Sequence, residues 1–449
     1  MADGAIAAAA PKPAQQAAQR RTDGAAATTG SYIFTLLGTG GDIWPGVMIA
    51  AELQRRGHTV VVLSYDYFAD EIARAGVPFV AIGSAAEYLA QVTTARFWER
   101  HGTSKGLDEN GYLRLALRPV YDYIVSRLAE VPLLVCTRNA YGARFAAEKF
   151  GLPVLCLAFS STQFASAERF PYSAPSLARL PLWMRRISMA LGDQLYNQPL
   201  LKKLNPLRES VHLPTVRRMR PWSFFGTPSL ALYPSWYNDV TDLAHYGVRQ
   251  ANFVFARSDE GAPLLDELTN FLQAGEPPVA FTFGTGVAHV REVFEKAVAA
   301  LSALGMRGLF ITKFGQNLPA DVGQSLVVPY ADFAALLPRV ALLVHHGGVG
   351  TAAQAIRAGV PQLIIPLAFD QPDNAHRFKA LGLAEFLPSQ KFPVAALVEA
   401  IRRALSNVSR DRLMELRQVL LRNDGSALAA DHCEAFFNLQ AGPRRVAAR

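Results

Sequence analysis

The sequence predicts an α/β protein built from two doubly wound, Rossmann-like domains in tandem. A chain of 449 residues is too long for one ordinary hydrophobic core. Apolar runs of strand length alternate with segments of helical periodicity, which is typical of βαβ units around a parallel sheet. This alternation occurs twice, before and after residues 165–240, which are rich in Pro, Arg and aromatic residues. Ligands bind at the carboxyl ends of such strands, so we expect a cleft between the two domains.

The first alternating region defines an N-terminal domain over residues 31–250. It is preceded by residues 1–30, a stretch of Ala, Gln, Thr and Gly that we expect to be a disordered tail. The domain opens with an apolar strand at 32–37, a glycine turn and a helix at 44–56, which Gly57 ends. Further strands are expected at 59–64, 77–82, 133–136 and 154–159, with helices at 71–75 and 140–150.

The second region defines a C-terminal domain over residues 277–425, after a linker at 251–276 that contains Gly and Pro breakers. Strands are expected at 279–283, 308–312, 325–328, 342–345 and 362–366, and helices at 290–304, 332–337 and 350–358. The domain continues with helices at 393–405 and 410–422. Residues 426–449 are expected to form a C-terminal helix and tail.

Composition excludes several classes of protein. Half of the residues are apolar and 18% are charged, which is typical of a globular protein. No run of eighteen apolar residues and no secretory signal is present, so we expect a cytoplasmic protein. The three cysteines, Cys136, Cys156 and Cys433, lack metal-ligand spacing, which favours buried thiols over a disulfide framework or a zinc site.

The formal net charge of +8 favours anionic partners such as phosphates or an acidic membrane surface. The basic residues are spread along the chain without an RNA-binding signature, so no nucleic-acid partner is expected. Residues 180–204 combine apolar residues with Arg185, Arg186, Lys202 and Lys203. Two interpretations stay open for this segment: peripheral contact with an anionic membrane, or a solvated basic face.

The first motif is the glycine turn that follows the first strand, Gly38-Thr39-Gly40-Gly41-Asp42-Ile43. A dinucleotide fingerprint requires a third glycine where Ile43 stands, which weakens a dehydrogenase interpretation. The motif leaves a carboxylate, Asp42, at the mouth of the sheet. Asp42 is either a helix N-cap or a general base that faces the cleft.

The second motif is His345-His346-Gly347-Gly348-Val349-Gly350-Thr351, where a strand passes into a helix. Glycines allow the backbone to approach a ligand, and the free N–H groups of a helix start attract an anion. With a histidine and the Thr351 hydroxyl as donors, the pattern predicts a diphosphate site that needs no metal. The other interpretation is a tight turn with structural histidines.

Two weaker motifs follow other strands of the second domain. Asp370 and Gln371 place a carboxylate beside an amide, a pair that can bind vicinal sugar hydroxyls or can simply form a polar turn. Thr285, in the first turn of the domain, offers a further hydroxyl for a phosphate.

Residues 332–377 resemble the donor-binding signature of inverting, nucleotide-sugar-dependent glycosyltransferases with the GT-B fold, and residues 38–60 resemble their first βα unit. This superfamily includes sterol, vancomycin-type and plant secondary-metabolite enzymes. The resemblance implies a diphosphate site at His346, Gly347, Gly348, Gly350 and Thr351. It also implies that Asp370 and Gln371 hold the sugar, that Thr285 contacts a phosphate, that Val328 and Pro329 lie near the base, and that Asp42 is the catalytic base.

The resemblance implies no cofactor and no metal, because the nucleoside-diphosphate sugar is a co-substrate. In the plant enzymes an aspartate partners the catalytic histidine, whereas residues 135–139 of this chain offer no carboxylate. Asp42 is therefore expected to act without a carboxylate partner.

Within the superfamily, the chain most resembles the rhamnosyltransferases of rhamnolipid synthesis. The matching features are residues 96–98, 119–123, 143–153 and 233–237. This resemblance implies transfer of L-rhamnose from dTDP-L-rhamnose to a 3-(3-hydroxyalkanoyloxy)alkanoate, and a partner subunit that supplies the acceptor. Candidate residues for an apolar acceptor pocket are Phe159, Phe164, Phe170 and Tyr172, although residues of this kind more often belong to an ordinary core.

Two alternatives stay open at this point. One is a UDP-glucose-dependent glucosyltransferase that acts on a sterol, polyketide or other apolar aglycone. The other is a catalytically silent subunit that binds a nucleotide sugar.

Overall fold

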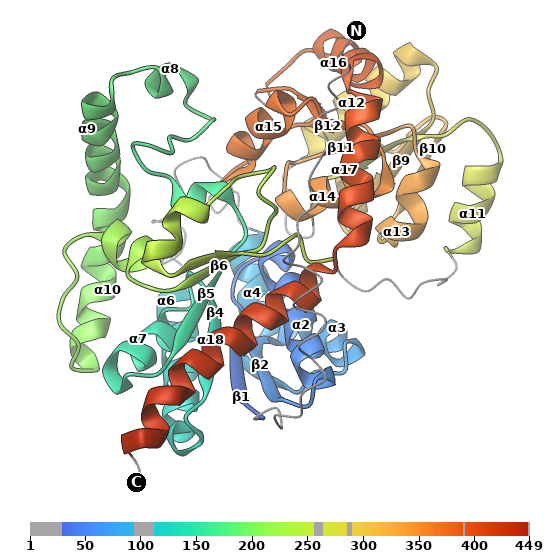
Figure 1. The fold of residues 1–449 in the computed structure, drawn as a ribbon. Helices are drawn as coiled ribbons and strands as arrows, with labels where there is room; N and C mark the ends of the chain where they lie inside the picture. Colours follow the sequence, from blue (N-terminus) through green and yellow to red (C-terminus); the bar gives the residue numbers. More distant parts are fainter. Residues whose placement is uncertain (1–28, 94–111, 256–263, 285–289, 389–390, 448–449) are drawn as a thin grey trace, which may run out of the picture.

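The computed structural model describes residues 29–93, 112–255, 264–284, 290–388 and 391–447, and contains one parallel sheet in each half of the chain (Figure 1). Residues 1–28 of the predicted tail lie outside the described residues, as do residues 96–98. The two sheets follow one another along the chain, as expected for tandem α/β domains.

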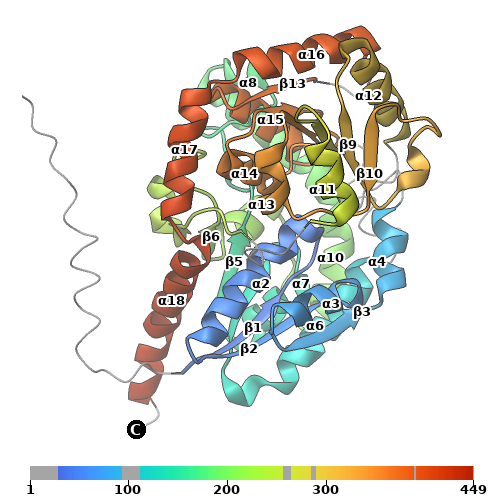
Figure 2. The same ribbon diagram turned by 90° about the vertical axis from the view of Figure 1, so that its right-hand side faces the viewer.

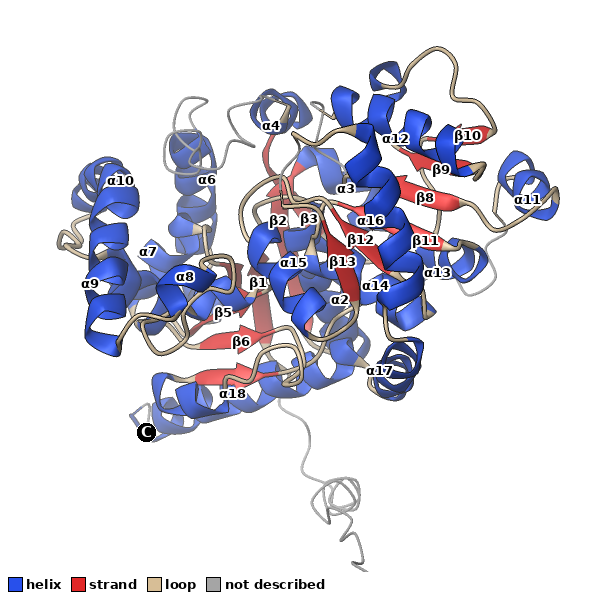
Figure 3. Cartoon of the chain, turned by 90° about the horizontal axis from the view of Figure 1, so that it is seen from above, coloured by secondary structure: helices blue, strands red, loops and turns tan. Residues whose placement is uncertain are grey.

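The N-terminal sheet has seven parallel strands in the order β3-β2-β1-β4-β5-β6-β7. The strands are β1 (Ser31–Thr35), β2 (Thr59–Tyr65), β3 (Phe79–Gly83), β4 (Leu133–Thr137), β5 (Val154–Ala158), β6 (Ser229–Ala231) and β7 (Val248–Gln250). Helices α2 (Gly40–Arg55) and α18 (Gly425–Ala447) cover one face, and α6 (Tyr112–Ser126) and α7 (Tyr141–Phe150) cover the other (Figure 3). This double cover explains why the strands are apolar throughout.

The C-terminal sheet has six parallel strands in the order β10-β9-β8-β11-β12-β13. The strands are β8 (Val279–Thr282), β9 (Gly308–Ile311), β10 (Ser325–Val328), β11 (Leu342–His345), β12 (Gln362–Ile364) and β13 (Ala384–Phe386). Its helices are α11 (Asp266–Gln273), α12 (Arg291–Leu304), α13 (Phe333–Leu336), α14 (Val349–Ala358), α15 (Gln371–Ala380), α16 (Val394–Asn407) and α17 (Arg410–Arg422). Leu268 of α11, within the predicted linker, packs into the core of this sheet.

Both sheets have the doubly wound strand order, so the predicted fold class is confirmed. The order reverses between β1 and β4 in the first sheet and between β8 and β11 in the second. Loops at such switch points separate and leave room for ligands at the carboxyl ends of the strands. The Asp42 motif follows β1 and the His345–Thr351 motif follows β11, so each lies at the switch point of its sheet.

The segment of weak periodicity, residues 165–240, folds onto the N-terminal domain through polar and aromatic contacts. The shorter helices of this domain are α3 (Ala69–Arg74), α4 (Ala85–Val92), α8 (Pro175–Ala178), α9 (Leu182–Gly192) and α10 (Gln198–Ser210). Arg208 of α10 is buried and donates two hydrogen bonds to the Glu148 carboxylate, at 2.8 and 2.6 Å. The guanidinium of Arg144 lies 3.9 Å from the centre of the Trp222 ring. Contacts of this kind have no helical or strand period, so the sequence pattern was weak.

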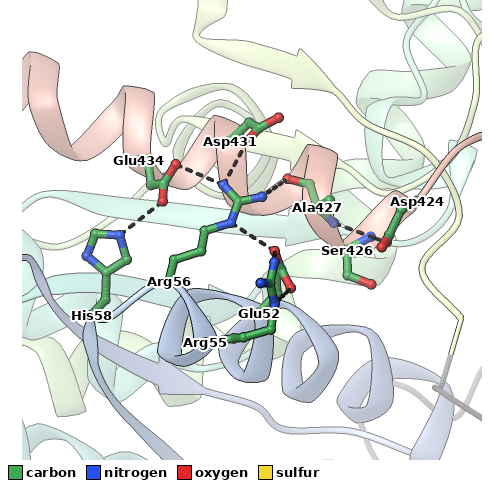
Figure 4. Close-up of polar contacts among 9 residues, drawn as sticks. All are labelled: Glu52, Arg55, Arg56, His58, Asp424, Ser426, Ala427, Asp431 and Glu434. Atoms are coloured by element: carbon green, nitrogen blue, oxygen red, sulfur yellow. Dashed lines mark hydrogen bonds and ion pairs between the residues drawn. The ribbon is translucent and has the colours of Figure 1, made fainter. Parts of the chain in front are cut away.

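Helix α18 leaves the C-terminal domain and packs along α2 of the N-terminal domain (Figure 2). Arg56, just after α2, is the main polar anchor (Figure 4). Its guanidinium donates to Glu52, to Asp431 at 2.7 Å and to Glu434 at 2.9 Å, while His58 contacts Glu434 at 3.0 Å. The apolar face of α18, with Ala429, Ala430 and Cys433, joins the N-terminal core.

The two places where the chain passes between the domains touch each other. Gly425, the first residue of α18, lies against the backbone of Phe253, and a Cβ atom at position 425 would overlap the Phe253 carbonyl oxygen. Nearby, the ring Nε2 of His432 and the carbonyl of Gln250 are 3.1 Å apart. A glycine is therefore required where α18 crosses the interdomain segment.

Replacement of Gly425 by alanine is expected to lower the free energy of unfolding by about 1–3 kcal/mol, because the new methyl group overlaps backbone atoms. The matched control is Gly192→Ala, at a helical glycine with open space around it, which is expected to gain about 0.5–1 kcal/mol. Chemical denaturation of both variants measures the difference. Equal stability of Gly425→Ala and the wild type would contradict the close contact.

Candidate active site

Asp42 lies in the first turn of α2, where it forms a capping box with Thr39. Thr39 is the N-cap residue, and Asp42 is the third residue of the helix, so the simple N-cap interpretation of Asp42 is wrong. Its Oδ2 accepts hydrogen bonds from the Thr39 backbone N–H at 2.8 Å and from the Thr39 hydroxyl at 3.2 Å. Within the described residues, Oδ1 has no protein donor. One carboxylate oxygen is thus fixed and the other is available to a substrate.

The loop that carries Asp42 is held by neighbouring strands. Thr137 of β4 accepts the Leu37 N–H at 3.0 Å through its hydroxyl, and Ser64 of β2 donates to the Leu36 carbonyl at 2.8 Å. Gly38 has φ +135°, and a Cβ at this position would overlap the Asp42 carboxylate. Sequence reasoning missed Thr137 and Ser64, because only the strand order brings them to this loop.

The environment of Asp42 moves its pKa towards neutrality. Burial, with a smaller contribution from the charge of Asp370, raises the pKa of Asp42 to about 6 against the hydrogen bonds from Thr39. Asp370 belongs to the C-terminal domain, so a charge from each domain contributes to the electrostatics of the site. Burial also raises the pKa of Asp370. A carboxylate with a pKa near 6 can act as a general base at neutral pH.

An aromatic cluster that the sequence analysis did not select lies beside Asp42. The Tyr67 and Tyr88 rings stack at 4.7 Å between centres, and Phe68 packs edge-on against Tyr88 at 5.0 Å. Burial raises the pKa of Tyr88, and the nearby Asp42 charge contributes to the rise. Lys313 of the C-terminal domain lies 5.6 Å from the Tyr67 ring centre. The three aromatic residues at 65, 67 and 68, at the end of β2 and directly after it, were the signal available in the sequence.

The first histidine of the glycine-rich motif is structural. His345 is fully buried; its Nδ1 accepts the Gly347 N–H at 3.1 Å, and its Nε2–H therefore donates to the Gln362 oxygen at 3.0 Å. Burial lowers the pKa of His345 to about 3, so the ring is neutral. It fixes the backbone of the loop that follows β11.

The second histidine, His346, is only partly buried and lies among glycines. A Cβ at Gly348 would lie 2.7 Å from its Nε2, and Gly284 after β8, with φ +82°, would meet its Cε1 at 3.2 Å. Burial lowers the pKa of His346 to about 4. Its Nδ1 is buried without a well-formed hydrogen bond in the described part of the chain. The neutral ring can therefore donate one N–H to an anionic ligand.

The start of α14 adds backbone donors next to His346. Gly348 is the N-cap, and the first bond of the helix runs from the Ala352 N–H to the Gly348 carbonyl at 3.0 Å. The N–H groups of Val349, Gly350 and Thr351 precede that bond. Free N–H groups and the positive end of the helix dipole favour a phosphate at such a site.

Asn374 connects the two loops of the donor side and was not selected from the sequence. Its buried amide donates to the Gly347 carbonyl and to Asp370 Oδ2, both at 2.9 Å. Its Oδ1 accepts the Tyr237 hydroxyl at 2.6 Å from the N-terminal domain. One side chain therefore fixes the glycine loop and Asp370, and also ties both to the other domain.

The side-chain oxygen of Gln371 holds the loop that precedes α15. Its Oε1 accepts the N–H groups of Leu367 and Ala368, at 2.8 and 2.9 Å, which leaves its NH₂ group for a ligand. Phe369, which follows Ala368, has φ +57°, a strained conformation for a residue with a large side chain. The strain lies directly before Asp370.

Helix α15 makes further polar contacts with the N-terminal domain. Asp373 accepts the Ser161 hydroxyl at 2.8 Å. The Arg377 guanidinium contacts the Tyr237 carbonyl at 3.3 Å and lies 4.2 Å from the centre of the Tyr172 ring. These contacts hold the donor loops and the Asp42 domain in one arrangement.

The remaining predicted residues are placed as follows. Thr285 lies outside the described residues. Val328 is buried in the core, Pro329 is exposed after β10, and the next residue, Tyr330, presents an exposed ring. Of the acceptor candidates, Phe164 has no exposed surface and packs under the Arg138 guanidinium. Phe159 is buried, Phe170 is half-buried and Tyr172 is exposed. The ligand contacts of all these residues stay predictions.

The described residues contain no group of three His, Cys, Asp or Glu side chains that could hold a metal ion. They also contain no helix that is long and apolar enough to cross a membrane.

The comparisons with known proteins agree with this architecture. Residues 32–167 match the N-terminal domain of glycosyltransferase family 28, and residues 312–429 match the C-terminal domain of the erythromycin biosynthesis protein CIII-like family. Two proteins of Amycolatopsis orientalis, glycosyltransferase GtfE and the vancomycin aglycone glucosyltransferase, are 29% and 28% identical. They cover 89% and 88% of this chain and 96% and 94% of their own lengths.

A solved structure of the spinosyn rhamnosyltransferase SpnG with thymidine diphosphate has a TM-score of 0.60 and 17% identity, and covers 90% of this chain and all of its own. Two Rossmann-like domains whose switch-point loops face each other define the GT-B fold. The chain has this fold, and one region in each half matches a glycosyltransferase-related family model. The chain is a nucleotide-sugar-dependent hexosyltransferase.

The raised pKa of Asp42 predicts an acid limb in the pH profile. If the ionised carboxylate is the base, kcat/KM is expected to fall as the pH drops through about 6, where Asp42 takes up a proton. Thr39→Val removes a donor to the carboxylate and is expected to move this limb to higher pH by up to about one unit. Thr39→Ser keeps the hydroxyl and serves as the control. An unchanged limb in Thr39→Val would contradict the assignment.

The contacts of Asn374 predict a graded effect of two substitutions. Asn374→Ala releases the glycine loop, Asp370 and Tyr237 together, and is expected to raise the donor KM about tenfold or more. Tyr237→Phe removes only the bond between domains and is expected to change the donor KM less than about threefold. Steady-state kinetics at saturating acceptor measure both. Equal effects of the two variants would contradict a positioning role for Asn374 in donor binding.

Proposed function

We propose that the chain is an inverting rhamnosyltransferase that transfers L-rhamnose from dTDP-L-rhamnose to the hydroxyl of a 3-(3-hydroxyalkanoyloxy)alkanoate and forms a mono-rhamnolipid. The observation that carries sugar transfer is that the charge of Asp370 acts on Asp42 from the other domain, while Asn374 connects Asp370 to the glycine loop before α14. The choice of sugar and acceptor rests on the resemblance to the rhamnosyltransferases of rhamnolipid synthesis. The likeness to SpnG, a rhamnosyltransferase solved with thymidine diphosphate, supports the donor class.

In this reaction Asp42 Oδ1 removes the proton of the acceptor hydroxyl while that oxygen attacks the anomeric carbon. The bond between the sugar and the diphosphate breaks on the opposite face, so the configuration inverts. General base assistance of this kind contributes about 10²–10⁴-fold. Thr39 and Asp370 change the pKa of Asp42 in opposite directions. The hydrogen bonds from Thr39 stabilise the carboxylate charge, and the negative charge of Asp370 destabilises it.

The departing diphosphate gains negative charge as the bond breaks. The N–H groups at the start of α14, the backbone of Gly347 and Gly348, the Thr351 hydroxyl and the His346 ring are donors for that charge. Such preorganised donors stabilise the transition state without a metal ion. Asp370 accepts sugar hydroxyls and the free amide of Gln371 donates to them. Thr285, Val328 and Pro329 complete the donor side in this proposal.

The acceptor needs an apolar channel that ends at the carboxylate. The aromatic cluster of Tyr67, Phe68 and Tyr88 beside Asp42 is suited to an alkyl chain, and Phe159, Phe170 and Tyr172 are candidates for its rim. An acceptor of this kind partitions into membranes. We therefore place the enzyme at the inner face of a cytoplasmic membrane, where a partner subunit supplies the acceptor.

The alternative is a UDP-glucose-dependent glucosyltransferase that acts on a sterol, polyketide or other apolar aglycone. It is favoured by the likeness to the vancomycin aglycone glucosyltransferase over 88% of the chain. The same donor site and base would serve it, so only the identity of the product separates the two.

Mass spectrometry of products tests the proposal. The purified protein is offered dTDP-L-rhamnose and UDP-glucose together with a 3-(3-hydroxyalkanoyloxy)alkanoate, and a rhamnosylated lipid is expected, also in excess EDTA. Asp42→Asn keeps an acceptor for the Thr39 N–H and is expected to lower turnover at least about 100-fold with donor binding retained. A glucosylated product alone would favour the alternative. Turnover of Asp42→Asn within tenfold of the wild type would remove Asp42 from the role of base.

A further inference from the structure

Helix α9 and the π-helical turn that continues it, Asp193–Asn197, present a row of large apolar side chains to solvent. Trp183, Ile187, Leu191 and Leu195 are 62%, 51%, 58% and 69% exposed. They follow each other at intervals of four residues, the spacing of a ridge along a helix surface. Exposed Leu177 and Leu182 extend the row towards α8.

This distribution is the reverse of that on an ordinary surface helix, which buries its apolar stripe. No residue of α9 is fully buried, and its inner side is formed by partly buried residues such as Met184 and Met189. The helix stands at the outer edge of the N-terminal domain (Figures 1 and 3). A contiguous exposed apolar row of this kind marks an interaction surface.

The charged residues of the segment that carries the row are mostly basic. Residues 175–204 contain five basic residues and one acidic residue, Asp193, which is buried. Arg179 and Lys202 are exposed near the ends of the row, and Arg186, on its flank, is paired with the exposed Glu168 carboxylate at 3.0 Å. Trp and Leu on one side with Arg and Lys beside them is the pattern of a helix that lies in the interface of an anionic bilayer.

We propose that the α8–α9 surface docks on anionic lipid bilayers. The side chains of Trp183, Ile187, Leu191 and Leu195 enter the boundary between headgroups and acyl chains, while Arg179 and Lys202 bind lipid phosphates. The inference goes beyond the proposed reaction, because docking does not depend on which sugar or acceptor the enzyme uses.

The docking surface is continuous with the edge of the domain interface. Ser173, two residues before α8, donates its N–H to Asp373 of α15 at 3.3 Å, and Tyr172 stacks under Arg377. A docked helix α9 therefore brings this edge of the interface close to the bilayer surface.

Vesicle sedimentation without donor or acceptor tests the proposal. Because neither substrate is present, the result does not depend on whether the proposed reaction occurs. The wild type is expected to sediment with phosphatidylglycerol vesicles, less with phosphatidylcholine vesicles, and less in high salt. Trp183→Gln combined with Ile187→Gln is expected to weaken partitioning at least about tenfold. Arg179→Gln combined with Lys202→Gln is expected to weaken binding to the anionic vesicles alone.

The matched control is Leu265→Gln combined with Leu439→Gln, which changes equally exposed apolar residues elsewhere and is expected to leave partitioning unchanged. Circular dichroism of each variant checks that the fold is retained. The proposal is overturned if the wild type does not sediment, or if the α9 variant sediments like the wild type. It is also overturned if light scattering without lipid shows a dimer that Trp183→Gln separates, since the row would then be a subunit interface.

Discussion

The buried amide of Asn374 is the contact on which the geometry of the site depends. The base and the donor loops belong to different domains, so their distance is set by whatever joins the domains near the reacting atoms. Asn374 binds Gly347, Asp370 and Tyr237 at once, and neighbouring Asp373 and Arg377 add contacts to the same side. Positioning two reactants accounts for a large share of the rate that an enzyme can provide. In this protein that positioning passes through one face of α15.

Electrostatics divide the interface into two unlike halves. On one side, burial raises the pKa values of Asp42 and Asp370; the charge of Asp370 adds to the rise at Asp42, and the charge of Asp373 adds to the rise at Asp370. On the other side, the histidines are neutral because burial lowers their pKa values, and the positive end of α14 has no charged side chain in its first turn. An anionic diphosphate fits the second half, while the first is suited to neutral hydroxyl groups. The same backbone architecture thus separates a site for a leaving anion from a site for proton removal.

The sequence predicted the elements whose signals are local. Strands β10 and β11 have the predicted bounds, and the glycine and histidine loop lies at a switch point as expected. Helix α15 was not predicted as a helix, because its start contains the turn formers Asp370, Pro372 and Asn374 and because the buried residues of its first turn are polar. Ser161 and Tyr237 of the N-terminal domain form the hydrogen bonds to these polar side chains. Tyr237 lies 137 positions from its partner Asn374 in the sequence. The start of α2 was placed too late for a related reason: a capping box puts its carboxylate inside the helix, so Asp42 resembled a cap.

The two connections between the domains involve different contacts, and those of α15 bear on turnover. Helix α18 is held by an apolar face in the N-terminal core and by the Arg56 cluster, and Gly425 packs on the interdomain segment. Helix α15 contacts the N-terminal domain through hydrogen bonds, through Arg377 on tyrosine rings, and through Phe378, whose ring centre lies 5.3 Å from that of Tyr237 in a shared apolar cluster. Any opening on the side of the donor loops for product release must break these contacts. Since the α15 contacts also shape the donor loops, opening would loosen the grip on the diphosphate at the same moment.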